Sequence, residues 1–278
     1  MIIVKTVEEI KDVVFRLHSN GKSVGLVPTM GALHKGHLSL VEKAHKENEV
    51  VVCSIFVNPV QFNNREDLEN YPRHLKNDIA ALEGIADIVF APSVEEVYPE
   101  EPQETFNFGN LENVMEGVAR PGHFNGVATI IHRFFTWIEP EKAYFGEKDF
   151  QQLAIIKELV KQEFPMIEIV GCPICREESG LALSSRNQRL TEEGKMVAAN
   201  IYRILQESTK LPQNSVENIK NFIREEVAKC PAMELEYIEI VDDLDLQPVN
   251  SFKNQHGIVG CIVVFVEGVR LIDNIRYK

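Results

Sequence analysis

The chain has 278 residues with a formal net charge of −13, and its 44% hydrophobic content allows one large domain or two unequal domains with a full core. The negative charge argues against a nucleic-acid partner, because such binding depends on Lys and Arg neutralising phosphates. No apolar run approaches the roughly 20 residues of a membrane span and the first residues resemble no secretory leader, so we expect a cytoplasmic enzyme without a membrane partner.

Strands and helices are predicted to alternate through the first 173 residues. A strand at residues 1–4 precedes a helix that opens with the capping box Thr6-x-x-Glu9 and ends at Gly21. Residues 50–56 form a nearly continuous apolar run, as in a buried parallel strand. The other strands are expected at 23–28, 87–91, 142–145 and 167–171, and the other helices at 38–47, 72–83, 124–138 and 149–164. This alternation favours a doubly wound parallel α/β sheet with its ligand at the strands' carboxyl ends.

The pattern changes after about residue 173. Helical patterns at about 191–208 and 215–229 precede strand patterns at 235–241, 258–265 and 269–272. We therefore predict two domains, residues 1–173 and a smaller α+β domain of residues 174–278.

The segment from Pro28 to His37 is the most informative one. It brings His34 and His37 to the start of a helix, where backbone N–H groups and the helix dipole attract phosphate. Two imidazoles there can donate hydrogen bonds to charge that develops on a phosphorus centre. Gly31 and Gly36 leave room for a ligand to approach the backbone. The alternatives are plain surface polarity or a metal pair, which usually has a third ligand and a carboxylate nearby.

Two further junctions follow predicted strands. Asn58 and Gln61 can hydrogen-bond hydroxyl and carboxylate oxygens without adding charge, or they form a polar turn around Pro59. In the segment 144–152, Lys148 can pair with phosphate. Asp149 can cap the helix or hold a ribose or Mg²⁺. Gln152 falls on the first helical turn, near Gln61 if the two junctions are neighbours.

Three other segments have an open interpretation. The hydroxyls and the guanidinium of residues 183–187 suit a triphosphate, or they belong to an ordinary polar loop. The glycine-rich segment 120–127 binds an anion or simply turns the chain. Cys172 and Cys175 form a lone C-x-x-C. Because the cysteine count is odd and neither a second pair nor a nearby histidine accompanies them, we expect reduced thiols and not a redox or zinc site.

Several enzyme classes lack their motifs here. The chain has no G-x-S-x-G elbow of a serine hydrolase, no G-x-x-x-x-G-K-[ST] loop of a P-loop NTPase and no G-x-G-x-x-G of a dinucleotide oxidoreductase.

Five motifs in order make the chain similar to a known family. They are Pro-Thr-Met-Gly-Ala-Leu-His-Lys-Gly-His (28–37), Phe-Val-Asn-Pro-Val-Gln-Phe (56–62), Arg-Pro-Gly-His-Phe-Asn-Gly-Val (120–127), Tyr-Phe-Gly-Glu-Lys-Asp-Phe-Gln-Gln (144–152) and Leu-Ser-Ser-Arg-Asn (183–187). Together they resemble the pantothenate synthetase (pantoate–β-alanine ligase) family of the cytidylyltransferase-like, HIGH-motif nucleotidyl transferases. The His-x-Gly-His element alone is shared with class I aminoacyl-tRNA synthetases and small nucleotidyltransferases.

The resemblance implies a reaction and an architecture. Members condense (R)-pantoate with β-alanine, using ATP and Mg²⁺, through a pantoyl adenylate, and release pyrophosphate and AMP on the way to coenzyme A. Their fold is a Rossmann-like doubly wound parallel sheet with a smaller C-terminal α+β lid domain, and they are usually homodimers. The chemistry agrees with the residues, because adenylation of a carboxylate needs two anions held in line and charge stabilised at phosphorus, without an enzyme nucleophile.

Site residues follow from the matching positions. His37 matches the family's proton donor, and His34, Lys148 and Arg186 complete the implied catalytic set. Gln61 and Gln152 hold pantoate, and Gln61 also meets β-alanine. The implied ATP-binding residues are Met30, Gly31, Ala32, Leu33, His34, Lys35, Gly36, His37, Gly146, Glu147, Lys148, Asp149, Cys175, Leu183, Ser184, Ser185 and Arg186. Cys175 contacts adenine through its backbone, and the protein ligands of the metal are unknown.

Two residues depart from the family pattern: Ser179 stands where Asp is usual, and Leu183 where Met is frequent. Neither change removes a phosphate ligand. The alternatives are a related nucleotidyltransferase that leaves AMP on its product, a class I synthetase fragment that charges tRNA, and a non-catalytic nucleotide sensor. The net charge of −13 and the short C-terminal domain argue against the tRNA enzyme.

Overall fold

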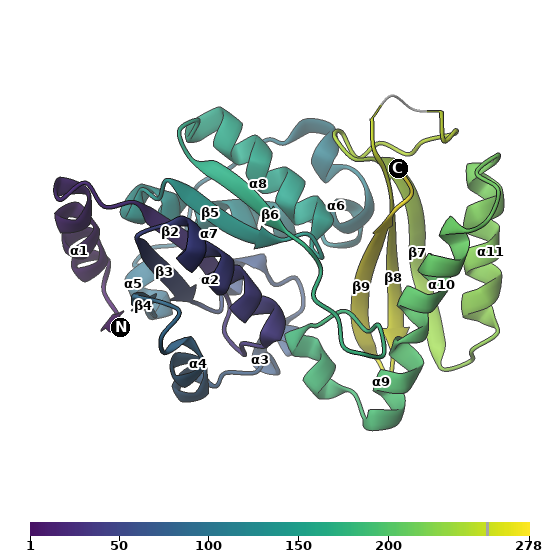
Figure 1. Cartoon of the computed structure of the whole chain (residues 1–278), viewed down its shortest axis with the longest axis horizontal. Helices are drawn as coiled ribbons and strands as arrows, with labels where there is room; N and C mark the ends of the chain where they lie inside the picture. Colours follow the sequence, from purple (N-terminus) through teal and green to yellow (C-terminus); the bar gives the residue numbers. More distant parts are fainter. Residues whose placement is uncertain (254–255) are drawn as a thin grey trace. The chain divides into compact units, whose positions relative to one another are not determined.

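The computed structural model describes residues 1–253 and 256–278, and these residues pack as two compact units (Figure 1). The first unit consists of residues 1–108, 120–147 and 152–173. The second consists of residues 109–119, 148–151 and 174–278. The predicted boundary after residue 173 assigns two of these segments, 109–119 and 148–151, to the first domain, whereas in the structure they pack with the second unit.

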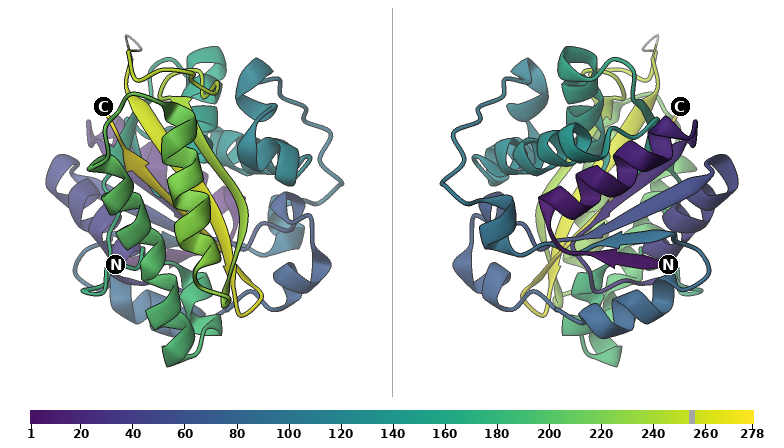
Figure 2. Two further views of the ribbon diagram at one scale, coloured as in Figure 1. Left: turned by 90° about the vertical axis from the view of Figure 1, so that its right-hand side faces the viewer. Right: turned by 90° about the vertical axis from the view of Figure 1, so that its left-hand side faces the viewer.

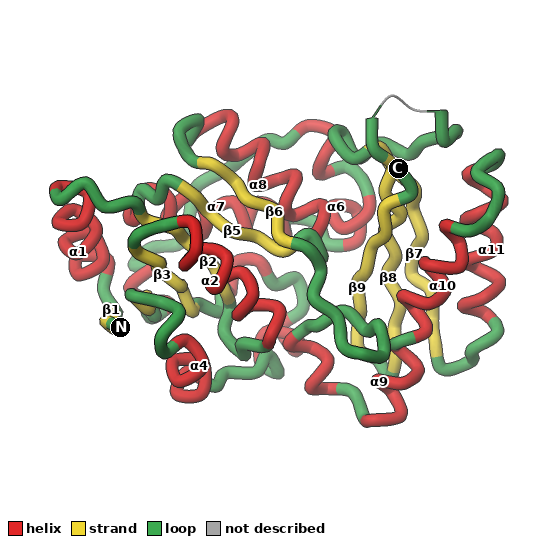
Figure 3. The backbone as a smooth tube through the Cα atoms, viewed as in Figure 1, coloured by secondary structure: helices red, strands yellow, loops and turns green. Residues whose placement is uncertain are grey.

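Within the described ranges, six parallel strands form the sheet of the first unit, in the order β1–β4–β3–β2–β5–β6. The strands are the yellow segments of the tube in Figure 3. The strands are β1 (Ile2–Val4), β2 (Val24–Thr29), β3 (Val50–Ile55), β4 (Ile88–Phe90), β5 (Lys142–Gly146) and β6 (Glu168–Cys172). The apolar residues of the four inner strands, β2 to β5, are almost all buried, as expected for parallel strands covered on both faces, whereas Ile2 and Ile3 of the edge strand β1 are exposed. The predicted doubly wound sheet is therefore confirmed, with each strand end within one residue of its prediction.

Helices connect and cover these strands. They are α1 (Val7–Ser19), α2 (Lys35–Glu47), α3 (Arg65–Glu69), α4 (Leu75–Leu82), α5 (Val94–Val97), α7 (His123–Ile138) and α8 (Phe150–Glu163). The capping box predicted for α1 is present. The Thr6 hydroxyl accepts from the Glu9 backbone N–H, and the Glu9 carboxylate accepts from the Thr6 backbone N–H. The short helices α3 and α5 were not predicted, because one turn is too short to show a 3.6-residue period.

Two apolar layers hold the sheet between its helices. On one face Val41 and Ala44 of α2 and Leu82 of α4 share a buried cluster with strand residues such as Val51. Elsewhere in the unit Phe134 of α7 packs edge-on against Phe90 of β4, and α1 contacts α7. The carboxyl ends of the strands remain the place where loops carry polar side chains.

In the second unit, and within its described residues, β7 (Met233–Asp242), β8 (Ile258–Val266) and β9 (Val269–Arg276) form an antiparallel sheet in that order. Helices α10 (Asn200–Thr209) and α11 (Val216–Ala228) lie on one face of it (Figure 2), and this unit also contains α6 (Met115–Ala119) and α9 (Glu192–Ala198). The predicted single helix over 191–208 was wrong. It is interrupted at Ala199, which keeps helical φ and ψ but accepts only a long bond, 3.5 Å, from the Arg203 N–H. A hydrophobic pattern does not reveal such a small irregularity.

Across the described residues, we find no helix with the length and apolar character needed to cross a membrane. All five cysteines are described, and none of them is in a disulfide.

Candidate active site

The turn between β2 and α2 carries both histidines. The helix was predicted to begin after His37, and this was wrong: it begins at Lys35, with His34 as its N-cap. The Gly36 N–H donates to His34 Nδ1 over 3.2 Å. Histidine is not among the residues preferred at this position, so the pattern of usual capping residues did not reveal the true start. His37 therefore lies inside the first turn of the helix.

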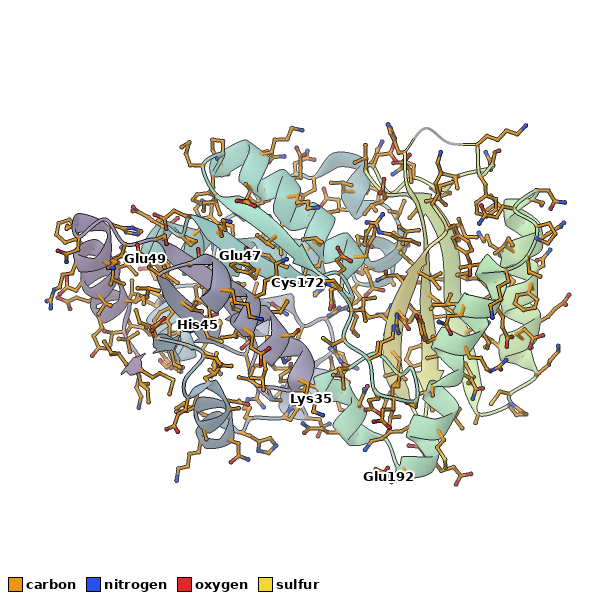
Figure 4. The ribbon with its side chains drawn as sticks, in the orientation of Figure 1. Lys35, His45, Glu47, Glu49, Cys172 and Glu192 are labelled. Carbon is orange, nitrogen blue, oxygen red and sulfur yellow. The ribbon has the colours of Figure 1, made fainter. Side chains whose placement is uncertain are left out.

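The two imidazoles lie against each other, with ring centroids 4.0 Å apart and planes inclined by 31°. Because Nδ1 of His34 accepts the capping bond, the proton of its neutral ring resides on Nε2, which is then a donor. The first turn of α2 consists of Lys35, Gly36, His37 and Leu38, so no acidic side chain of this turn opposes the positive end of the helix dipole. Lys35 is seen at this end in Figure 4, with Glu47 at the other. The arrangement suits an anion.

A carboxylate that the sequence reasoning missed builds this turn. Asp78 of α4 is 3% exposed, and its Oδ2 and Oδ1 accept from the N–H groups of Ala32 (3.0 Å) and Leu33 (2.7 Å). Gly31 has a φ of +80°, and a Cβ there would lie 3.0 Å from Asp78 Oδ2. A glycine is therefore favoured at position 31, because it adopts the positive φ and leaves room for the Asp78 carboxylate. The signal was present, because an isolated acid lies among the apolar positions Leu75, Ile79 and Leu82 of one helix.

The predicted amides follow β3 in a short 3₁₀ turn, η1 (Pro59–Gln61). Asn58 and Gln61 are both buried, and their side chains are hydrogen-bonded to each other. Gln61 Nε2 lies 3.0 Å from Met30 Sδ, so the structure brings Gln61 next to the first predicted nucleotide-binding residue. The polar-turn interpretation is correct for the backbone, and the turn also presents an amide beside the histidine-bearing loop.

The glycine-rich segment 120–127 supports this turn. Gly126 lies so close to η1 that a Cβ on it would be 2.5 Å from Val60 O. His123 is buried, with Nδ1 2.8 Å from Gln61 O and Nε2 3.1 Å from a guanidinium nitrogen of Arg120. Because the guanidinium only donates, Nε2 accepts, and the Nδ1–H donates to Gln61 O. The segment therefore turns the chain and holds the backbone of Gln61.

The junction after β5 lies on the other side of β2. In the sheet β2 separates β3 from β5, so Gln61 and Gln152 follow strands that flank β2 and are not immediate neighbours. The Glu147 N–H donates to Cys172 O over 2.8 Å, which ties this loop to the end of β6. Gln152 lies in the first turn of α8, as predicted.

Gly146 ends β5 in the first unit, whereas the predicted ATP ligands from Lys148 onward belong to the second unit. Lys148 is largely buried, with Nζ 4.0 Å from Asp149 Oδ2, and its backbone oxygen accepts from Asn274 Nδ2 over 3.0 Å. Cys175 O accepts from the Leu183 N–H over 3.0 Å. This bond closes a turn of residues 175–183. The five predicted ligands between residues 175 and 186 lie within or beside this turn; they are Cys175, Leu183, Ser184, Ser185 and Arg186. Ser184 Oγ caps η3 (Ser185–Arg189) through the Arg186 N–H.

An ion pair organises that turn. Arg176 is bonded through two nitrogens to Asp273, at 2.7 and 2.8 Å, and one of these nitrogens also lies 3.2 Å from Gly180 O. The same guanidinium lies 3.5 Å from the ring centre of Tyr202. Planarity and two-point binding are both needed here, and lysine supplies neither.

Replacing Arg176 by lysine is therefore expected to lower the free energy of unfolding by about 2 kcal/mol, because charged hydrogen bonds to a buried carboxylate are lost. Urea unfolding measures this change. The control is Arg203→Lys, since Arg203 pairs with Glu207 on the exposed face of α10 and should change the free energy by less than about 0.5 kcal/mol. Equal effects for the two variants would show that the buried pair has no special role.

Three of the five cysteines, Cys53, Cys172 and Cys261, are buried. Burial raises the pKa of the Cys53 and Cys261 thiols to about 12, and Cys172 is buried at the end of β6 (Figure 4). A thiol with so high a pKa is protonated at neutral pH and unreactive.

Comparison with known proteins gives a consistent result. The family model described as pantoate-beta-alanine ligase matches residues 2–276. A pantothenate synthetase of Phocaeicola vulgatus is 53% identical over 281 aligned residues, covering 100% of both chains. The pantothenate synthetase structure from Thermus thermophilus matches with a TM-score of 0.93, 41% identity and full coverage of both chains. A pantoate-beta-alanine ligase from Francisella tularensis, solved in complex with beta-gamma ATP and beta-alanine, matches with a TM-score of 0.84 and 37% identity over 100% of this chain and 98% of that one.

Proposed function

The chain belongs to the pantoate-beta-alanine ligase family, and from this premise we propose that it joins pantoate to β-alanine using ATP. In the first step a pantoate carboxylate oxygen attacks the α-phosphorus of ATP, and the bond to pyrophosphate breaks. In the second step the β-alanine amine attacks the acyl carbon of the adenylate, loses a proton and expels AMP. The relatives are named pantothenate synthetase and pantoate-beta-alanine ligase, so an enzyme that leaves AMP on its product is not favoured.

The observation that carries this proposal is the stacked histidine pair at the start of α2. Nε2–H of His34 and the ring of His37 supply donors beside backbone N–H groups of the helix end. Charge that develops on the phosphate oxygens during attack is stabilised there, and each well-aimed donor contributes about 3 kcal/mol to the transition state. Asp78 keeps the preceding loop in place, so the donors are positioned before the substrate binds.

We propose neutral amides for the pantoate site. Gln61 and Gln152 hydrogen-bond the hydroxyl and carboxylate oxygens of pantoate, and Gln61 also meets β-alanine. Neutral donors orient the carboxylate without the strong stabilisation that a cation gives to a nucleophile's charge. For ATP we propose the loop residues 30–37, residues 146–149, Cys175 and residues 183–186, with Lys148 and Arg186 supplying positive charge.

We also propose that Mg²⁺ accompanies ATP, and that the enzyme is a cytoplasmic homodimer. Among the residues that the structure describes, no group of three or more His, Cys, Asp or Glu side chains is placed to hold a metal ion. We propose that the ion is held mainly by phosphate oxygens and water, as is usual for Mg²⁺ with nucleotides. Sedimentation of the purified chain tests the dimer.

Product analysis tests the reaction. The enzyme is incubated with ATP, Mg²⁺, pantoate and β-alanine, and the products are separated by liquid chromatography with mass detection. We expect pantothenate, AMP and pyrophosphate in equal amounts. A product that keeps the adenylyl group would identify the nucleotidyltransferase alternative instead, and pantothenate formed together with ADP would contradict adenylation.

A further inference from the structure

The side-chain amide of Asn58 can face only one way. One of its terminal atoms lies 2.9 Å from Gly126 O, which can only accept, so that atom is the Nδ2 donor. The other lies 3.4 Å from the Val60 N–H, which can only donate, so it is the Oδ1 acceptor. Asn58 is 1% exposed, and its two ends are therefore assigned by backbone groups of fixed polarity.

The hydroxyl of Tyr98 reinforces this orientation. It donates to Asn58 Oδ1 over 2.8 Å. The Tyr98 ring packs beside Phe56, with centroids 6.0 Å apart, and its centre lies 4.7 Å from the guanidinium of Arg133. Burial raises the pKa of the Tyr98 hydroxyl above its usual value, so the group stays protonated and remains a donor at neutral pH.

The orientation of Asn58 determines that of Gln61. The same Asn58 Nδ2 lies 3.1 Å from one terminal atom of Gln61, which must accept and is therefore Oε1. Gln61 Nε2 then points toward the Met30 thioether, 3.0 Å away. Sulfur of this kind is a weak acceptor, so a substrate oxygen can replace it at a gain in hydrogen-bond energy.

We propose that Tyr98 and Asn58 are positioning residues that hold the Gln61 amide with its N–H₂ end toward the substrate. The site then selects a substrate oxygen at this position, a carboxylate or hydroxyl of pantoate or the carboxylate of β-alanine, and disfavours an ammonium group there. This inference rests on the proposed function, in which Gln61 contacts pantoate.

We call the hydrogen bonds from Tyr98 to Asn58 and from Asn58 to Gln61 the relay. The variant Asn58→Asp replaces the Nδ2 donor of the relay by an acceptor oxygen. A carboxylate cannot donate to Gly126 O or to Gln61 Oε1, so the Gln61 amide is expected to rotate and direct its Oε1 toward the substrate. In pyrophosphate–ATP exchange the KM for pantoate should rise at least about tenfold, because the Gln61 Oε1 acceptor would then face an acceptor oxygen of pantoate. The KM for ATP should stay within about twofold. An unchanged KM for pantoate would overturn the proposal.

Tyr98→Phe removes one hydroxyl and keeps the ring, so it tests the relay if Asn58→Asp does not fold. We expect a smaller rise of the KM for pantoate, about threefold to tenfold, with the KM for ATP unchanged. The matched control is Tyr277→Phe, which removes a hydroxyl bonded to the buried Ser208 in the second unit and should alter neither KM. Equal KM values for Tyr98→Phe and the control would contradict the role of Tyr98.

An NMR measurement separates this inference from the proposed function. With ¹³C-methyl methionine and ¹⁵N glutamine labels, the Nε2 protons of Gln61 should show a nuclear Overhauser effect to the Met30 methyl group. The effect should weaken in Asn58→Asp. If the wild-type chain shows no pantoate-dependent exchange, the proposed function fails, but the Overhauser effect still decides the orientation of Gln61. Its persistence at full strength in Asn58→Asp would refute the relay.

Discussion

Replacing His37 by alanine is expected to slow pantoate-dependent pyrophosphate–ATP exchange by about 100-fold or more while the fold is retained. His37 lies in the first turn of α2 with its ring against that of His34, and alanine removes the donor that we propose for the reacting phosphate. The free energy of unfolding should change little, because alanine is a good helix former at this position. Exchange of labelled pyrophosphate into ATP measures the rate.

The matched control for His37→Ala is His45→Ala. His45 lies on the exposed face of the last turn of the same helix (Figure 4), so its loss should leave exchange within about twofold of the wild-type rate. If His37→Ala retains an almost normal rate, the catalytic donor has been placed on the wrong residue.

Replacing Asp78 by alanine is expected to lower the free energy of unfolding by about 3 kcal/mol or more and to slow exchange about tenfold or more. The two N–H groups of Ala32 and Leu33 lose their charged acceptor in a buried place, and each unsatisfied donor costs about 1–3 kcal/mol. The loop that precedes the histidines is then free to shift, and misplacement by about 1 Å is enough for a large loss of rate. Urea unfolding and the exchange assay measure the two effects.

Two further variants serve as comparisons for Asp78→Ala: the conservative change Asp78→Asn and the exposed control Glu83→Ala. Asparagine keeps the shape but can accept with only one of its two terminal atoms, so an intermediate loss of stability is expected. Glu83 follows the same helix and is exposed, and its removal should alter the free energy by less than about 0.5 kcal/mol. Were Asp78→Ala to behave like Glu83→Ala, the carboxylate would not be what holds the loop.

Local patterns predicted most of the framework. The strands of the sheet were found because buried parallel strands are apolar on both faces, as in the run at 50–55. The start of α1 was found because Thr6 and Glu9 lie close in sequence and bond only to nearby groups. The start of α2 was missed by a few residues, because its cap is a histidine, a residue type that seldom takes this role.

Contacts between residues distant in sequence could not be predicted in the same way. Asp78 reaches a loop about 45 residues earlier, and Tyr98 reaches Asn58 about 40 residues earlier. Neither residue belongs to a short motif, and the partners meet only after the sheet has brought their elements together. The motifs contain the residues that we propose for the reaction, whereas Asp78 and Tyr98, which bond to the segments that carry them, became visible only in the structure.

The central claim is that the chain activates pantoate by adenylation at the histidine pair before the amine takes part. Exchange of labelled pyrophosphate into ATP, measured with pantoate alone, with β-alanine alone and with neither, tests this most directly. We predict exchange that requires pantoate and proceeds without β-alanine. Exchange that appears without pantoate, or only once β-alanine is added, would contradict the claim.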